Sequence, residues 1–104
     1  NIDLPIEYYQ IDSPTCNTGR ARNISEGGLL IYFPERIEIG QRLKLKLFFT
    51  SKSNLHSMEV LCEVVWIDIH LNETWGDYRS GVKFIDVSQE DMTQLKDFLK
   101  SLSQ

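Results

Sequence analysis

The residues best suited to chemistry in this chain are Asn23, Ser25 and Gly28, in the stretch Asn-Ile-Ser-Glu-Gly-Gly between two strand-like segments. The amide and the hydroxyl offer hydrogen-bonding groups, and a glycine lets a small ligand approach the backbone closely. The same residue types are also common in ordinary tight turns, because they tolerate left-handed backbone or bond their own main chain. Taken alone, the Asn-x-Ser-x-x-Gly pattern therefore favours a structural turn over a binding site.

Two arginines and a tryptophan are the next candidates. Arg20 and Arg22 alternate with Ala21 on the segment that enters the turn, so a strand would place both guanidinium groups on one face. Such a face is commonly solvated, and the alternative is a contribution to an anion-binding site. Trp66 closes a β-branched, apolar segment, where it is either a stacking platform for a nucleobase or part of the core wall. Trp75 falls in a predicted loop and is interpreted as a surface or packing residue.

The other polar residues do not form a pattern typical of an enzyme. His56 and His70 are far apart, with no nucleophile or metal-ligand spacing around them, and Asp68 and Glu73 have no distinguishing context. We therefore expect a non-enzymatic protein without catalytic residues, metal ligands or a cofactor. A basic stripe alternates with leucines at Arg42, Lys44 and Lys46, and it is interpreted as a solvated face or else as a partner surface.

Composition and charge limit the possible functions. The 104 residues, 41% of them apolar, are enough for one domain over residues 1–104 with a single core. A net charge of -4 argues against non-specific binding to nucleic acid or to an anionic membrane. No apolar run reaches the roughly 20 residues of a membrane span, and no signal peptide is visible. Two cysteines, Cys16 and Cys62, do not make a disulfide framework, so we expect reduced thiols and a cytoplasmic location.

Hydrophobic alternation predicts strands near residues 4–8, 15–24, 29–33, 43–47, 60–69 and 81–87, with loops at 51–57 and 71–78. The segment at 60–69 is expected to be buried on both sides for part of its length. After residue 88 the period becomes helical, with apolar residues at Met92, Leu95, Leu99 and Leu102, and Ser88 is a suitable N-cap. The elements predict a mainly β fold, a small antiparallel barrel of six to seven strands with one C-terminal helix.

Several segments, in order along almost the whole chain, resemble motifs of the PilZ family of bacterial cyclic di-GMP receptors. They are the Asn-x-Ser-x-x-Gly turn and the segments Leu4–Tyr8, Gly27–Ile31, Gly40–Leu45 and Gly81–Asp86. The resemblance implies that Asn23 hydrogen-bonds a guanine edge or orients an arginine, that Ser25 offers its hydroxyl, and that Gly28 allows close approach. It also implies that Trp66 can stack on a guanine, as an aromatic does in some members, and Arg20 and Arg22 would add cationic charge.

One family signature, Arg-x-x-x-Arg, does not occur in this chain, and the match of the Leu-Pro segment would place its second arginine one or two residues before Asn1. Because the chain begins with Asn rather than Met, we expect a fragment or a chain whose leading residues are left out. The first hypothesis is a cyclic di-GMP sensor that signals to a partner protein or fused output domain, without nucleic acid or membrane insertion.

The alternative is an adaptor that does not bind the nucleotide and works through partners in pilus, flagellar or motility systems. A patch formed by Tyr9, Tyr32 or Ile85 would favour this alternative. A third hypothesis, a binder of single-stranded nucleic acid built on a small barrel, is disfavoured by the net charge of -4.

Overall fold

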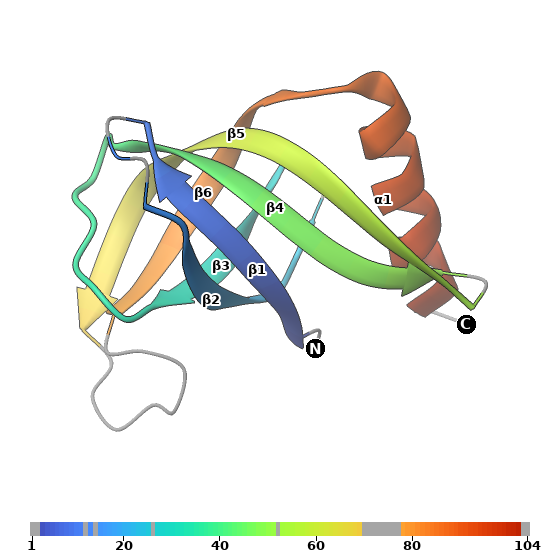
Figure 1. Ribbon diagram of the computed structural model, residues 1–104, viewed down its shortest axis with the longest axis horizontal. Helices are drawn as coiled ribbons and strands as arrows, with labels where there is room; N and C mark the ends of the chain where they lie inside the picture. Colours follow the sequence, from blue (N-terminus) through green and yellow to red (C-terminus); the bar gives the residue numbers. More distant parts are fainter. Residues whose placement is uncertain are drawn as a thin grey trace.

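A computed structural model describes residues 3–11, 13, 15–25, 27–51, 53–69 and 78–102 (Figure 1). Within these residues, six strands and one helix follow each other along the chain: β1 (Asp3–Gln10), β2 (Asn17–Arg22), β3 (Gly28–Phe33), β4 (Arg42–Ser51), β5 (Asn54–Ile69), β6 (Tyr78–Val87) and α1 (Gln89–Leu102). All strand pairs are antiparallel, and they close a barrel in the order β1-β2-β3-β6-β5-β4. The predicted mainly β barrel with a C-terminal helix is confirmed, with six strands in the described part of the chain. Trp75, His70 and most of the predicted loop at 71–78 lie outside the described residues.

The barrel is filled by alternate residues of its strands. Leu43, Leu45 and Leu47 of β4 are each at most 1% exposed, whereas Lys44 between them is exposed. Because successive side chains of a strand point to opposite faces, this alternation puts the leucines inside and the basic residues outside. The basic stripe that alternates with these leucines in the sequence therefore lies on the outer face of β4.

The hairpin between β4 and β5 differs from the prediction. Ser51 pairs with Asn54, and Ser53 has a left-handed backbone with φ of 66°, so the connection is short and the expected loop at 51–57 is wrong. β5 begins early because its alternate residues still pack inward: His56 stacks on Phe49 with ring centroids 5.6 Å apart. β5 is also not buried on both sides, because its outward residues in the apolar stretch are half-buried or exposed.

The C-terminal helix begins as predicted. Ser88 Oγ accepts a hydrogen bond from the backbone N–H of Asp91 at 3.1 Å, which is the geometry of an N-cap. Leu95 and Phe98 are buried, and the Phe98 ring lies 4.8 Å from the ring of Phe49 near the end of β4. α1 lies beside the β4–β5 hairpin and covers that end of the barrel (Figure 1).

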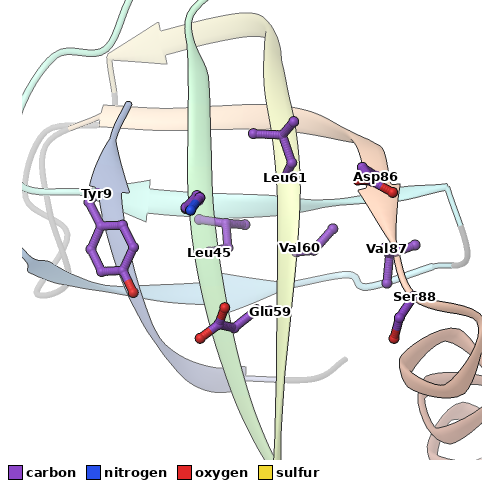
Figure 2. Close-up of a pocket in the computed structure, with 9 residues that line it drawn as sticks. Tyr9, Leu45, Glu59, Val60, Leu61, Asp86, Val87 and Ser88 are labelled. Atoms are coloured by element: carbon purple, nitrogen blue, oxygen red, sulfur yellow. The ribbon is translucent and has the colours of Figure 1, made fainter. Parts of the chain in front are cut away.

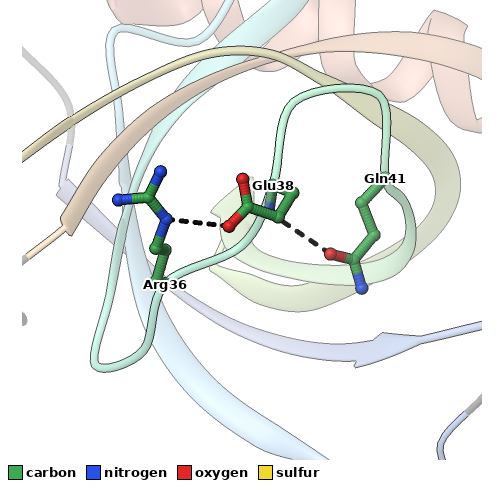
Figure 3. A network of polar contacts seen from close by, with 3 residues as sticks. All are labelled: Arg36, Glu38 and Gln41. Carbon is green, nitrogen blue, oxygen red and sulfur yellow. Dashed lines mark hydrogen bonds and ion pairs between the residues drawn. The ribbon is translucent and has the colours of Figure 1, made fainter.

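The segment between β3 and β4 packs against the barrel at another place. Its Ile37 is 1% exposed and belongs to the core. Arg36 forms an ion pair with Glu38 at 2.8 Å, and the backbone N–H of Glu38 donates to Gln41 at 3.3 Å (Figure 3). Backbone hydrogen bonds also tie the segment to β5, because Gly40 N–H donates to the Val64 carbonyl at 2.7 Å and Val64 N–H donates to the Gln41 carbonyl at 3.0 Å.

Candidate functional site

The turn between β2 and β3 holds the polar residues that the sequence singled out. Asn23 has φ of 52°, a left-handed conformation that asparagine tolerates better than most residues. Ile24 is 8% exposed and anchors the turn in the core. The backbone N–H and the hydroxyl of Ser25 both donate to the carbonyl of Gly28, at 2.9 and 3.3 Å, while Gly27 N–H donates to Ser25 Oγ at 3.3 Å. The turn is therefore fixed by its own hydrogen bonds.

Gly28 has a structural reason to be glycine that the sequence analysis did not predict. A Cβ at this position would lie 2.1 Å from the backbone carbonyl oxygen of Val82 on β6. The neighbouring Gly27 carbonyl accepts a hydrogen bond from Phe84 N–H at 2.9 Å. Gly28 thus allows strand β6 to approach the backbone closely. That Gly28 also allows a ligand to approach stays a prediction.

A surface pocket of about 470 Å³ lies beside the turn, within the roughly 300–1,000 Å³ typical of small-molecule sites. It brings four of the six predicted site residues together, and strands β3, β5 and β6 complete it. The lining residues are Asn23, Ser25, Gly28, Leu29, Leu30, Val65, Trp66, Arg79, Gly81 and Val82. Two hydrogen-bonding side chains, one large aromatic ring and one cation therefore share this pocket.

A β-bulge decides which way Trp66 points. The β5–β6 register shifts between Val64 and Trp66, and both Val65 and Trp66 are 41% exposed, whereas Val64 is fully buried. Strict alternation from Val64 would have turned Trp66 into the core, and the extra residue of the bulge turns it outward. A Cβ on Gly81 would lie 2.1 Å from Trp66 Nε1, so the indole rests directly on β6 at this glycine. Its other side remains accessible from the pocket.

Arg79 is a pocket residue that the sequence analysis missed. Its Nη2 lies 2.6 Å from Asp68 Oδ2, and its guanidinium carbon lies 5.9 Å from the centroid of the Trp66 ring. A hydrogen bond with Asp68 and, to a lesser extent, one with Tyr32 raise the pKa of Arg79 above its ordinary value, so this group stays cationic. The available signal was its position two residues before Gly81, which places both residues on the same face of a strand.

Arg20 and Arg22 share one face of β2, as their alternation predicts, because Ala21 between them is fully buried. Neither belongs to the described lining of the pocket, although Arg22 pairs with the lining residue Leu30. Arg20 lines a separate hollow together with Phe48 of β4. Their proposed role in ligand binding is therefore not supported by contact with this pocket.

A further hollow of about 300 Å³ lies on a different part of the barrel wall (Figure 2). Strands β1, β4, β5 and β6 contribute Tyr9, Lys44, Leu45, Glu59, Val60, Leu61, Asp86 and Val87, and Ser88 completes it. Tyr32 is only 4% exposed. Tyr9, Tyr32 and Ile85 therefore do not form the single exposed patch that would favour an adaptor.

The described residues contain no group of three or more histidine, cysteine or acidic side chains arranged to hold a metal ion. Burial raises the pKa of the Cys62 thiol to about 12, so this thiol is a poor nucleophile at neutral pH. In the described part of the chain, α1 is too short and too polar to cross a membrane.

The fold and the pocket define a small closed β-barrel domain with a C-terminal helix and a candidate ligand site beside a glycine-rich turn. The chain belongs to the PilZ domain family, whose model matches residues 1–101. No curated protein matches the chain in a sequence comparison.

Solved structures agree with this assignment at the level of the fold. The motility inhibitor MotI/DgrA of Bacillus subtilis has a TM-score of 0.79 at 14% identity, over 99% of this chain and 48% of that protein. The PilZ domain of CeSA from a cellulose-synthesizing bacterium has a TM-score of 0.65 at 11% identity, over 99% and 95% of the two chains. The PilZ domain of Escherichia coli YcgR, solved with c-di-GMP, has a TM-score of 0.66 at 18% identity, over 97% and 82%. This chain spans about half the length of the Bacillus protein.

Proposed function

We propose that this domain is a non-catalytic receptor for cyclic di-GMP that transmits binding to a neighbouring domain or partner protein. The observation that carries the proposal is the convergence of Asn23, Ser25, Gly28 and Trp66 in one surface pocket. These residues come from a turn and from a bulged strand far away in the sequence. Membership of the PilZ family and the ligand in the YcgR structure support the choice of nucleotide.

The pocket offers different chemistry to the parts of such a ligand. The exposed side of Trp66 suits a guanine, since stacking of a base on an aromatic side chain contributes about 1–3 kcal/mol. Asn23 can donate to and accept from a guanine edge. The Ser25 hydroxyl donates to the Gly28 carbonyl and its oxygen accepts from Gly27 N–H, so toward a ligand this group can act only as an acceptor, through its remaining lone pair. We therefore expect the Ser25 oxygen to accept a hydrogen bond from an N–H group of the base, and not to bind a phosphate.

The phosphates need cationic partners, which the family signature Arg-x-x-x-Arg would supply. Where a segment with such arginines precedes the domain, it would fold over the bound nucleotide. The ordering of that segment would change how the domain meets its neighbour, which is a common way to convert ligand binding into a signal. An acidic domain without these arginines should bind a doubly anionic ligand poorly.

Calorimetric titration of cyclic di-GMP into the full-length protein tests the proposal. Asn23→Ala and Ser25→Ala should each weaken binding by about tenfold or more, since each removes a hydrogen-bonding group from a partly desolvated site. Asn54→Ala and Ser57→Ala are matched controls, because they change exposed residues of the same types in β5, outside the pocket lining. Unchanged affinity in both pocket variants would remove the turn from the site.

A partner-binding role without the nucleotide is the second candidate. The hollow that contains Tyr9, Glu59 and Asp86 favours it, because this hollow combines an aromatic ring and aliphatic side chains with two carboxylates (Figure 2). Full-length protein that carries upstream arginines and still fails to bind cyclic di-GMP would make this role the leading one.

A further inference from the structure

Arg79 and Asp68 form a side-chain pair directly beside the indole of Trp66. In the β5–β6 register, Asp68 lies opposite Arg79, and Trp66 lies opposite Gly81. Both pairs follow the bulge, and residues two apart on a strand share a face, so the ion pair and the indole lie on the same outer face. The ion pair is 2.6 Å long, and its side chains are 31% and 46% exposed.

The guanidinium of Arg79 lies over the Trp66 ring without touching it in a stacked contact. Its carbon is 5.9 Å from the ring centroid, beyond the roughly 4 Å at which stacked carbon atoms touch. Trp66 accordingly keeps 41% of its surface exposed. A flat base laid on the indole would therefore have one edge next to the guanidinium of Arg79.

Arg79 also keeps hydrogen-bond donors for such an edge. A guanidinium has five N–H groups, and Asp68 and Tyr32 are its hydrogen-bond partners among the described residues. The Nε atom is buried without a partner, so the donors that remain for a ligand belong to the two Nη atoms. Asp68 pairs with one of these atoms at 2.6 Å, which limits the positions that the guanidinium can take.

We propose that Arg79 donates hydrogen bonds to the guanine base that stacks on Trp66. Asp68 is the positioning residue that holds the guanidinium of Arg79 in place for this contact. This inference rests on the proposed function, because it specifies the base that the same pocket selects. Guanine presents two adjacent acceptors, O6 and N7, to which an arginine can donate two hydrogen bonds. Adenine presents a donor in place of O6, so the same arginine bonds it less well.

The expected discrimination follows from this pairing. One good two-point contact between arginine and guanine changes the preference over the wrong base by about 5- to 150-fold. If Arg79 instead binds a phosphate, its loss must weaken guanine and adenine dinucleotides by the same factor. The two roles therefore differ in the ratio of the two affinities.

The test measures the dissociation constants of cyclic di-GMP and cyclic di-AMP for the full-length protein. Cyclic di-GMP is titrated directly, and cyclic di-AMP is measured by competition so that weak binding can be quantified. The variants are Arg79→Lys, which keeps the charge and removes the two-point geometry, and Asp68→Asn. Arg36→Lys is the matched control, because Arg36 forms a 2.8 Å ion pair with Glu38 outside the pocket (Figure 3).

Arg79→Lys should weaken cyclic di-GMP about tenfold or more and leave cyclic di-AMP unchanged, so that the preference for guanine falls. Asp68→Asn should lower the same ratio by a smaller factor, with Asp68→Glu restoring part of it, and Arg36→Lys should change neither constant. An unchanged ratio in Arg79→Lys, or an equal loss for both nucleotides, overturns the inference while the receptor function stands. A wild-type protein that binds neither nucleotide overturns the receptor function and this inference together.

Discussion

Gly81→Ala separates the role of Trp66 in binding from any role in folding. The new Cβ would lie 2.1 Å from Nε1, 2.5 Å from Cε2 and 2.8 Å from Cδ1 of Trp66, so the indole must leave its place on β6. These atoms belong to a side chain that is 41% exposed and can rotate into solvent. We therefore expect the free energy of unfolding to change by only about 1 kcal/mol or less.

The effect on ligand binding should be larger than the effect on stability. A displaced indole loses its stacking contact with the base, which amounts to about 1–3 kcal/mol, or roughly a 5- to 150-fold weaker affinity. Trp66→Ala should produce a loss of the same size, and the double variant should be no worse than either single variant because both remove one contact. Gly27→Ala is the control, since a Cβ there meets nothing within 4 Å.

Calorimetry of cyclic di-GMP binding and chemical denaturation of the same samples give the two quantities. Weaker binding at nearly constant stability is the expected result for Gly81→Ala. Loss of stability with unchanged affinity would show that the indole of Trp66 is a packing residue and would refute the stacking argument.

The remaining predictions concern stability. Gly28→Ala should cost more than 2 kcal/mol in denaturant unfolding, since its Cβ would meet a backbone carbonyl of β6 at 2.1 Å; a cost below about 0.5 kcal/mol would contradict this. Ser88→Ala should cost about 1 kcal/mol through loss of the N-cap of α1, with Gln89→Ala as a neutral control. Burial raises the pKa of Cys62 from 9.0 to about 12, so its contribution to stability is complete below pH 9 and is lost as pH rises toward 12. The free energy of unfolding should therefore fall less between pH 9 and pH 12 in Cys62→Ala than in the wild type. An equal fall in both proteins would contradict the raised pKa of Cys62.

Alternation in the sequence was sufficient to predict most of the barrel. Leu43, Leu45 and Leu47 show why: on a strand with one buried face, a period of two assigns each side chain to the core or to solvent. The hairpin prediction failed because Asn54 and Ser57 resemble loop residues, although both are exposed residues of a strand that continues. Local composition could not reveal that His56 packs on Phe49, because this contact exists only after the strands pair.

The polar turn of the candidate pocket could be predicted from the sequence. The direction of Trp66 and the presence of Arg79 in the pocket could not. Asn23 and Ser25 could be recognised because the turn motif is local in sequence. The outward direction of Trp66 depends on a bulge against β6, which is a property of two paired strands. Arg79 was missed because the predicted strand began at Gly81, whereas β6 begins at Tyr78. These residues meet in the pocket because of the register in which the strands pair, and this register cannot be read from a single sequence.

The most direct test of the receptor assignment is calorimetric titration of cyclic di-GMP into the full-length protein and its Asn23→Ala/Ser25→Ala variant. We predict saturable binding by the wild type and a loss of at least about tenfold in the variant, with both proteins equally folded. Equal binding by the two proteins would place the ligand elsewhere, and no binding by the wild type would contradict the proposed receptor function.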